Sequence, residues 1–83
     1  MDTILVVEDD HTVQKALQRL FEYEGYKVEV CSDGQSALDT FRMITPKAVI
    51  LDLGLPVLSG KDVCREIRRT TISLPIVVLL VYV

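Results

Sequence analysis

Four carboxylates of this 83-residue chain stand directly after short apolar runs. They are Glu8, Asp9, Asp10 and Asp52. The first three follow the run at residues 4–7, and the fourth follows the run at residues 48–51. If these runs are neighbouring parallel strands, their carboxyl ends border one crevice, where three or four carboxylates converge. Like charges at such distances raise one another's pKa, so the pattern predicts a bound hard cation such as Mg²⁺.

A carboxylate beside Mg²⁺ can also attack phosphorus. Aspartate nucleophiles form acyl phosphates, and the metal neutralises charge on the phosphoryl oxygens during transfer. The alternative is that residues 8–10 only begin a helix, because acidic groups favour helix N-termini. The position of Asp52 at the matching strand end favours the shared pocket.

Strands are needed to position these carboxylates. Three apolar runs, at residues 4–7, 48–51 and 76–80, are rich in β-branched residues and show no alternation with polar residues. Such runs indicate strands that are buried on both faces of a parallel sheet. Residues 28–30 alternate between Val and Glu, which is typical of an edge strand with one solvated face.

Helical patterns separate the strands. The first helix has an apolar stripe at the helical spacing, and Gly25 ends it. The stripe is Val13, Ala16, Leu17, Leu20 and Phe21. The second helix begins in a possible capping box, in which Gln35 reaches back to the backbone of Ser32, and Pro46 closes it. Its apolar face is Ala37, Leu38, Phe41 and Ile44.

The third helix begins near Ser59, with Asp62 three residues further on, and ends at two arginines. The element order is therefore β-α-β-α-β-α-β. Short loops and right-handed crossovers convert this alternation into one α/β domain with an open parallel sheet and helices on both sides.

The composition excludes several other classes. A content of 49% hydrophobic and 25% charged residues rules out a disordered tail or a collagen-like chain. The net charge of −3 argues against direct nucleic-acid binding. We expect Cys31 and Cys64 to be reduced in a cytoplasmic protein without a signal peptide. The apolar stretch at residues 76–83 is shorter than the roughly 20 residues of a membrane helix, so we expect no membrane association.

These motifs together resemble the receiver domain of two-component response regulators. The resemblance rests on ILVVEDD at residues 4–10, DG at 33–34 with AL at 37–38, VILDLGLP at 49–56, glycine at 60 and LPIVVL at 74–79. The Glu-Asp form of the acidic pair at residues 8–9 and the turn after Asp52 look most like the OmpR-type branch. This branch consists of transcription factors with a winged-helix output domain. The resemblance implies a flavodoxin-like sheet, whose first four strands have the order 2-1-3-4.

The resemblance also implies roles for individual residues. Asp52 would accept a phosphoryl group from a sensor histidine kinase. Asp9 would bind Mg²⁺ directly and Glu8 largely through water, while Asp52 and the Gly54 carbonyl would complete the protein ligands. Two further residues, Pro56 and Gly60, would shape the loop behind the acceptor. The fringe of the first helix would offer a docking surface at His11, Gln14, Lys15 and Gln18.

The chain departs from the receiver pattern at its end. Leu80 stands where the family has a switch Thr or Ser, and Val81 stands where a small residue is expected. The fourth helix, the fifth strand with its phosphate-binding lysine, and the fifth helix have no counterpart. We therefore expect residues 1–83 to be a C-terminally truncated receiver without an output domain, whose exposed fourth strand promotes self-association.

The function expected from the sequence is that of a phosphoacceptor module rather than an enzyme. Loss of the hydroxyl and the lysine predicts slow or undetectable phosphorylation, because each missing contact to the charged group costs about 1.5–3 kcal/mol. The alternative is an impaired fragment that acts only through self- or partner association. A haloacid dehalogenase-type hydrolase fits poorly, because Gly54 occupies the place of its second aspartate.

Overall fold

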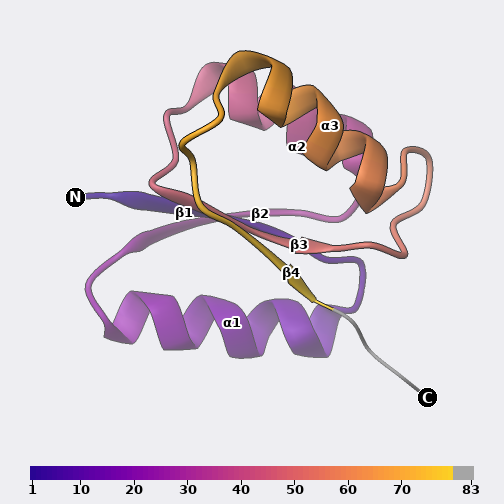
Figure 1. Ribbon diagram of the computed structural model, residues 1–83. Helices are drawn as coiled ribbons and strands as arrows, with labels where there is room; N and C mark the ends of the chain where they lie inside the picture. Colours follow the sequence, from indigo (N-terminus) through magenta and orange to yellow (C-terminus); the bar gives the residue numbers. More distant parts are fainter. Residues whose placement is uncertain (80–83) are drawn as a thin grey trace.

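The computed structural model describes residues 1–79, which form a four-stranded parallel sheet with three helices (Figure 1). The strand order β2-β1-β3-β4 confirms the predicted flavodoxin-like arrangement. The elements are β1 (Thr3–Val7), α1 (His11–Tyr23), β2 (Lys27–Cys31), α2 (Gly34–Met43), β3 (Ala48–Asp52), α3 (Gly60–Thr70) and β4 (Ile76–Leu79). Leu80 and Val81, where the sequence departs from the receiver pattern, lie outside the described residues.

The helices cover the sheet in two layers. Figure 1 shows α1 on one side of the sheet and both α2 and α3 on the other. Because side chains alternate along a strand, β1 contributes Leu5 and Val7 to the α2–α3 side, and Ile4 and Val6 to the α1 side. All four side chains are buried, which confirms the prediction that β1 is buried on both faces.

Short polar side chains fix where two of the helices begin. Asp10 caps α1 by accepting hydrogen bonds from the Thr12 and Val13 amides at 2.8 and 3.1 Å. Ser59 caps α3 by accepting from the Asp62 amide at 3.2 Å, and its hydroxyl donates to the Asp62 carboxylate at 3.0 Å. The predicted start of the third helix is therefore confirmed.

The predicted capping box at α2 is wrong. Asp33, with an extended backbone, is the N-cap and accepts from the Ser36 amide at 2.8 Å. The helix therefore begins one residue later than the box requires, so Gln35 lies too early in the first turn to reach back to Ser32. Its amide donates instead to Asp39 at 3.2 Å.

The apolar stripe of α1 is only partly covered. Leu17 and Phe21 pack against the sheet, but Ala16 is exposed and the Leu20 side chain is 54% exposed. Within residues 1–79, α1 is the only helix on its side of the sheet, so nothing covers this flank. The predicted ending is confirmed, because Gly25 adopts φ +95° directly beyond the helix cap.

The strand β4 differs from the prediction of burial on both faces. Val77 is 50% exposed and Val78 is 41% exposed. The reason is its place in the sheet, because within the described residues β4 has a neighbouring strand on one side only. An exposed fourth-strand edge was itself expected, and the structure has it. No helix within residues 1–79 is long and apolar enough to cross a membrane.

Candidate functional site

The carboxyl ends of β1 and β3 bring three carboxylates together. The two strands are neighbours in the sheet, with Val7 paired to Leu51, so the residues that follow these positions lie side by side. Carboxylate oxygens of Glu8, Asp9 and Asp52 all lie within 4.8 Å of one another. The predicted convergence is confirmed for these three residues. Asp10 instead uses its carboxylate to cap α1.

Glu8 is the buried member of this acidic cluster, with 4% of its surface exposed. One carboxylate oxygen, Oε1, accepts a hydrogen bond from the Asp10 amide at 3.0 Å. The other, Oε2, is buried and has no hydrogen-bond partner among the described residues. Burial, and to a lesser degree the charges of Asp52 and Asp9, raise the pKa of Glu8 above its ordinary value, although the Asp10 amide opposes this. The cluster therefore holds negative charge that its own residues do not neutralise.

Asp52 ends β3 and is only half-buried. Its Oδ1 accepts a hydrogen bond from the Gly54 amide at 3.1 Å, which orients the carboxylate, and Oδ2 accepts none from residues 1–79. Asp9 and Gly54 are exposed, so the cluster is open to solvent on this side. The carboxylate and carbonyl oxygens in this region are ligands of the kind that Mg²⁺ prefers.

Two glycines allow the loop behind Asp52 to pack closely. A Cβ atom on Gly60 would lie 2.2 Å from the Asp52 carbonyl oxygen, and one on Gly34 would lie 2.1 Å from the Leu58 carbonyl oxygen. The Gly60 amide also donates to the Leu53 carbonyl oxygen at 3.1 Å. The start of α3 therefore lies directly against the turn that carries Asp52.

The loop that joins β3 to α3 is exposed at its tip. Pro56 and Val57 are exposed, and the Leu58 amide donates to the Pro56 carbonyl oxygen at 2.8 Å. Val57 has φ 69°, a left-handed conformation that is unfavourable for a β-branched residue. Strained backbone of this kind occurs often beside functional sites.

Gln14 supports the cluster from α1, although the family resemblance implied a docking role for it. It is 7% exposed, and its side-chain amide donates to the Glu8 carbonyl oxygen and, at 3.0 Å, to the Ser32 hydroxyl. Its placement on a docking surface is therefore wrong, because burial removes it from contact with a partner. His11 and Lys15 are exposed, and Gln18 is half-buried. The helical spacing from Gln14 to Leu17 and Phe21 could have indicated this buried face.

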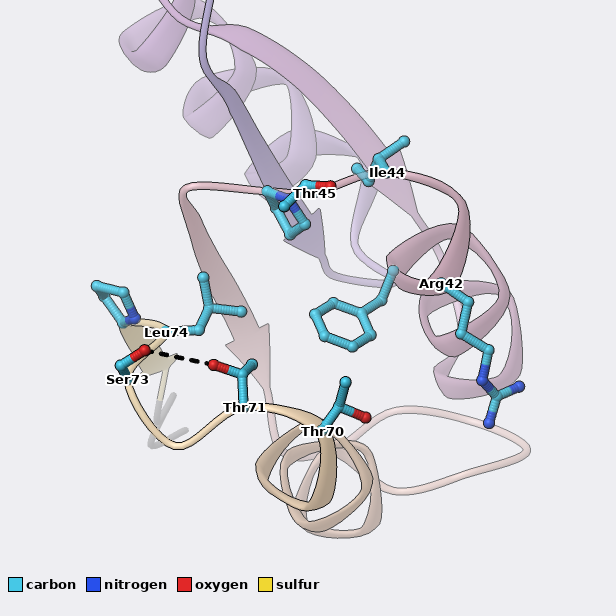
Figure 2. Close-up of a pocket in the computed structure, with 10 residues that line it drawn as sticks. Arg42, Ile44, Thr45, Thr70, Thr71, Ser73 and Leu74 are labelled. Atoms are coloured by element: carbon cyan, nitrogen blue, oxygen red, sulfur yellow. Dashed lines mark hydrogen bonds between the residues drawn. The ribbon is translucent and has the colours of Figure 1, made fainter.

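A cavity of about 550 Å³ lies at the opposite end of the sheet, between the ends of α2 and α3 (Figure 2). Figure 2 shows the Thr71 and Ser73 hydroxyls together at its margin, and these oxygens are 3.4 Å apart. The charged side chain in its lining, Arg42, lies 3.8 Å from Asp39 in an ion pair. No carboxylate lines this cavity in the described part of the chain, so it lacks the carboxylate ligands of the acidic cluster.

Comparisons with known proteins agree with this geometry. The family described as "Response regulator receiver domain" matches residues 4–82. The response regulator MprA of Mycolicibacterium vanbaalenii is 47% identical over 76 residues, which cover 92% of this chain and 33% of that protein. This chain therefore spans about a third of the length of the curated relatives that it matches.

Two solved structures show the same fold. One is a complex of the histidine kinase ThkA with the response regulator TrrA of Thermotoga maritima. A chain of this complex matches with 34% identity and a TM-score of 0.89, over 100% of this protein and 72% of the matched chain. The other is the receiver domain of the sensor histidine kinase PA1611 from Pseudomonas aeruginosa, with magnesium coordinated in its active-site cleft. It matches with 32% identity and a TM-score of 0.89 over 95% of this chain and 66% of that chain.

Proposed function

Because this chain belongs to the response regulator receiver domain family, we propose that it is a phosphoacceptor module that takes a phosphoryl group from a histidine kinase onto Asp52. The observation that carries the proposal is the acidic cluster, in which the Asp52 carboxylate lies beside the buried, unneutralised charge of Glu8. This cluster also disfavours the alternative of an impaired fragment that acts only by association.

Asp52 has the geometry of a nucleophile for this transfer. The Gly54 amide holds Oδ1, so Oδ2 is the oxygen that would attack phosphorus. The new bond joins Oδ2 to phosphorus, while the bond from phosphorus to the kinase histidine nitrogen breaks and the electron pair returns to the imidazole. The product is an acyl phosphate on Asp52 and an unphosphorylated histidine.

Mg²⁺ fits the remaining charge of the acidic cluster. The residues that would hold it are Asp9, Asp52, Glu8 largely through water, and Gly54 through its carbonyl oxygen. The partnerless Oε2 of Glu8 supports this assignment, because a buried carboxylate oxygen without a donor is unfavourable until a cation or a proton neutralises it. The bound metal would supply neutralisation of the charge on the phosphoryl oxygens. Pro56 and Gly60 would shape the loop that presents Asp52.

The module would act as a receiver of phosphate rather than as an enzyme with turnover. We expect self-phosphorylation and dephosphorylation to be weak, because Leu80 lacks the hydroxyl of the family's switch residue. A sensor kinase partner and two free cysteines agree with a cytoplasmic location. The OmpR-type resemblance supports a role of this module in a transcription regulator, and the net charge of −3 supports the expectation that the chain itself does not bind nucleic acid.

Phosphoryl transfer can be tested on the 83-residue chain itself. The chain is incubated with acetyl phosphate or with a phosphorylated histidine kinase, and the modified peptide is mapped by mass spectrometry. We expect slow labelling of Asp52 that requires Mg²⁺ and disappears on chelation. Labelling at another residue, or labelling that is unaffected by chelation, would contradict the proposal. Rapid stoichiometric labelling would contradict only the expectation of impaired chemistry.

The metal site has an independent test. In a ¹⁵N–¹H correlation spectrum, Mg²⁺ with beryllofluoride should shift the amide signals of Glu8, Asp9, Asp52 and Gly54. The Gly25 amide, at the far end of α1, serves as an internal control and should not move. A well-dispersed spectrum that does not respond to the metal would refute the proposed Mg²⁺ site.

A further inference from the structure

The cavity between the ends of α2 and α3 has the composition of a small-molecule site. Its volume of about 550 Å³ lies within the range of roughly 300–1,000 Å³ that is typical of ligand pockets. Phe41, Ile44 and Leu74 contribute apolar surface to its wall, and Phe41 adds an aromatic ring. The polar side chains in the wall are hydroxyl groups and the guanidinium of Arg42. Such a wall suits a ligand with an apolar body and a few polar substituents.

The electrostatics of the wall favour an anion. Among residues 1–79, Arg42 is the one charged side chain that lines the cavity. Its ion pair with Asp39 is 3.8 Å long and both side chains are 62% exposed, so the pair holds the guanidinium only weakly. Arg68 donates to the carbonyl oxygens of Thr71 and Leu74 at 3.4 and 2.7 Å. This second guanidinium counters the negative end of the α3 dipole, which would otherwise repel an anion.

Two hydroxyl groups line the cavity on the side opposite Arg42. Figure 2 shows Thr71 and Ser73 together on the loop between α3 and β4, whereas Arg42 comes from α2. The two hydroxyl oxygens are 3.4 Å apart, so one hydroxyl donates to the other, and the accepting hydroxyl keeps its own hydrogen for a ligand. The two bonds from Arg68 hold this loop in place. The hydroxyl pair is therefore formed before any ligand arrives.

We propose that this cavity binds an aromatic carboxylic acid whose ring carries a hydroxyl group. The guanidinium of Arg42 binds the carboxylate, because it presents paired N–H donors that match two carboxylate oxygens. The ring lies against the apolar surface of Phe41 and Leu74, and its hydroxyl joins the pair formed by Thr71 and Ser73. The charge, the apolar body and the hydroxyl of the ligand thus each have a counterpart in the wall.

A set of related compounds tests the proposal on the whole chain. Para-hydroxybenzoate, its neutral amide and benzoate are each titrated while ¹⁵N–¹H correlation spectra are recorded. The Thr71 and Ser73 amides report on the cavity, and the Asp52 amide, at the opposite end of the sheet, is the internal control. We expect para-hydroxybenzoate to shift only the cavity signals, with a Kd on the order of 1 mM. The amide should bind about tenfold more weakly, and benzoate about threefold.

Two results of these titrations would overturn the proposal. The first is the absence of any shift of the cavity signals with para-hydroxybenzoate. The second is equal binding of the acid and its amide, which would show that the cavity does not select an anion. Because Asp52 takes no part in this binding, either result would leave the proposed phosphoryl transfer unaffected.

The Arg42→Gln variant tests which group binds the carboxylate. It should bind the acid about tenfold more weakly than the unmodified chain and lose the preference for the acid over its amide. Arg65→Gln is the matched control, because Arg65 also forms an exposed ion pair with a residue three positions away, Asp62, but does not line the cavity. It should bind all the compounds like the unmodified chain. A preference for the acid that survives in Arg42→Gln would overturn the proposed role of Arg42.

The double variant Thr71→Val with Ser73→Ala tests the hydroxyl pair. It removes both hydroxyl groups and leaves the bonds from Arg68 to the loop carbonyls in place. Para-hydroxybenzoate should then bind no more tightly than benzoate, while the affinity for benzoate should match that of the unmodified chain. An unchanged preference for para-hydroxybenzoate over benzoate would overturn the placement of the ligand hydroxyl.

Discussion

Among residues 1–79, the acidic cluster and the β4 edge both contain polar groups without partners, but the kind of group differs. At the cluster, the group without a partner is a buried carboxylate oxygen of Glu8, in the company of two further negative charges. At β4, the groups are alternating neutral amides and carbonyls flanked by exposed valines. A cation would neutralise the first region, whereas the second region carries no charge. The cluster should therefore respond to metal and pH, and the β4 edge should respond to neither.

The largest expected effect is the loss of phosphoryl labelling in Asp52→Asn. The amide is a poor nucleophile, so labelling by acetyl phosphate should fall to background while the fold is retained. Asp39→Asn is a suitable control, because it removes an exposed carboxylate from α2, away from the cluster. If Asp52→Asn were labelled as fast as the unmodified chain, Asp52 would not be the phosphoryl acceptor. The acidic cluster would then not differ from the β4 edge in its phosphoryl chemistry.

The next effect concerns the close packing behind Asp52. Gly60→Ala places a Cβ atom 2.2 Å from a backbone oxygen that cannot move without displacing β3. We expect a loss of about 3 kcal/mol or more in the free energy of unfolding, measured by urea denaturation. Gly54→Ala is the matched control, since its Cβ would meet only the Asp52 carboxylate at 3.9 Å. Similar losses in both variants would show that the close approach does not determine stability here.

A smaller loss is expected for Gln14→Leu. The substitution leaves the Glu8 carbonyl oxygen and the Ser32 hydroxyl without the donor that joins them, which should lower the unfolding free energy by about 1–3 kcal/mol. The variant should also bind Mg²⁺ more weakly in a calorimetric titration, because the loop that carries Glu8 is less well held. Lys15→Leu, at an exposed neighbouring position, should change neither quantity.

The smallest expected effect is a gain in stability for Glu8→Gln without metal. Because the folded pKa of Glu8 is raised above its unfolded value, the ionised carboxylate destabilises the fold as the pH rises through that window. At neutral pH the variant should be more stable on the order of 1 kcal/mol, and the advantage should disappear in acid. Thermal unfolding at several pH values measures this difference. Mg²⁺ should stabilise the unmodified chain more than the variant, and an advantage that persists in acid would contradict the assigned cause.

The parts predicted from the sequence are those determined by regular periodicity. The apolar runs of β1 and β3 reflect burial on both faces. Because functional groups collect at the carboxyl ends of parallel strands, the sequence was sufficient to predict that Asp52 lies beside Glu8 and Asp9. The errors arose where the outcome depended on neighbours in three dimensions. Burial of Gln14 depends on the β2–α2 loop above it, and exposure of Val77 depends on the absence of a strand beside β4 within the described residues.

The central place of β1 in the sheet also determines when the acidic cluster can form during synthesis. β1 emerges first from the ribosome, but one of its partners starts at Lys27 and the other at Ala48. Pairing over such separations is slow, because the intervening chain must close a loop before any contact is gained. Glu8 and Asp9 therefore cannot form the cluster until Asp52 has been translated and β3 has docked. The carboxylates of the cluster therefore repel one another only late in synthesis. By then most of the apolar core has been made, and its burial can stabilise the fold against this repulsion.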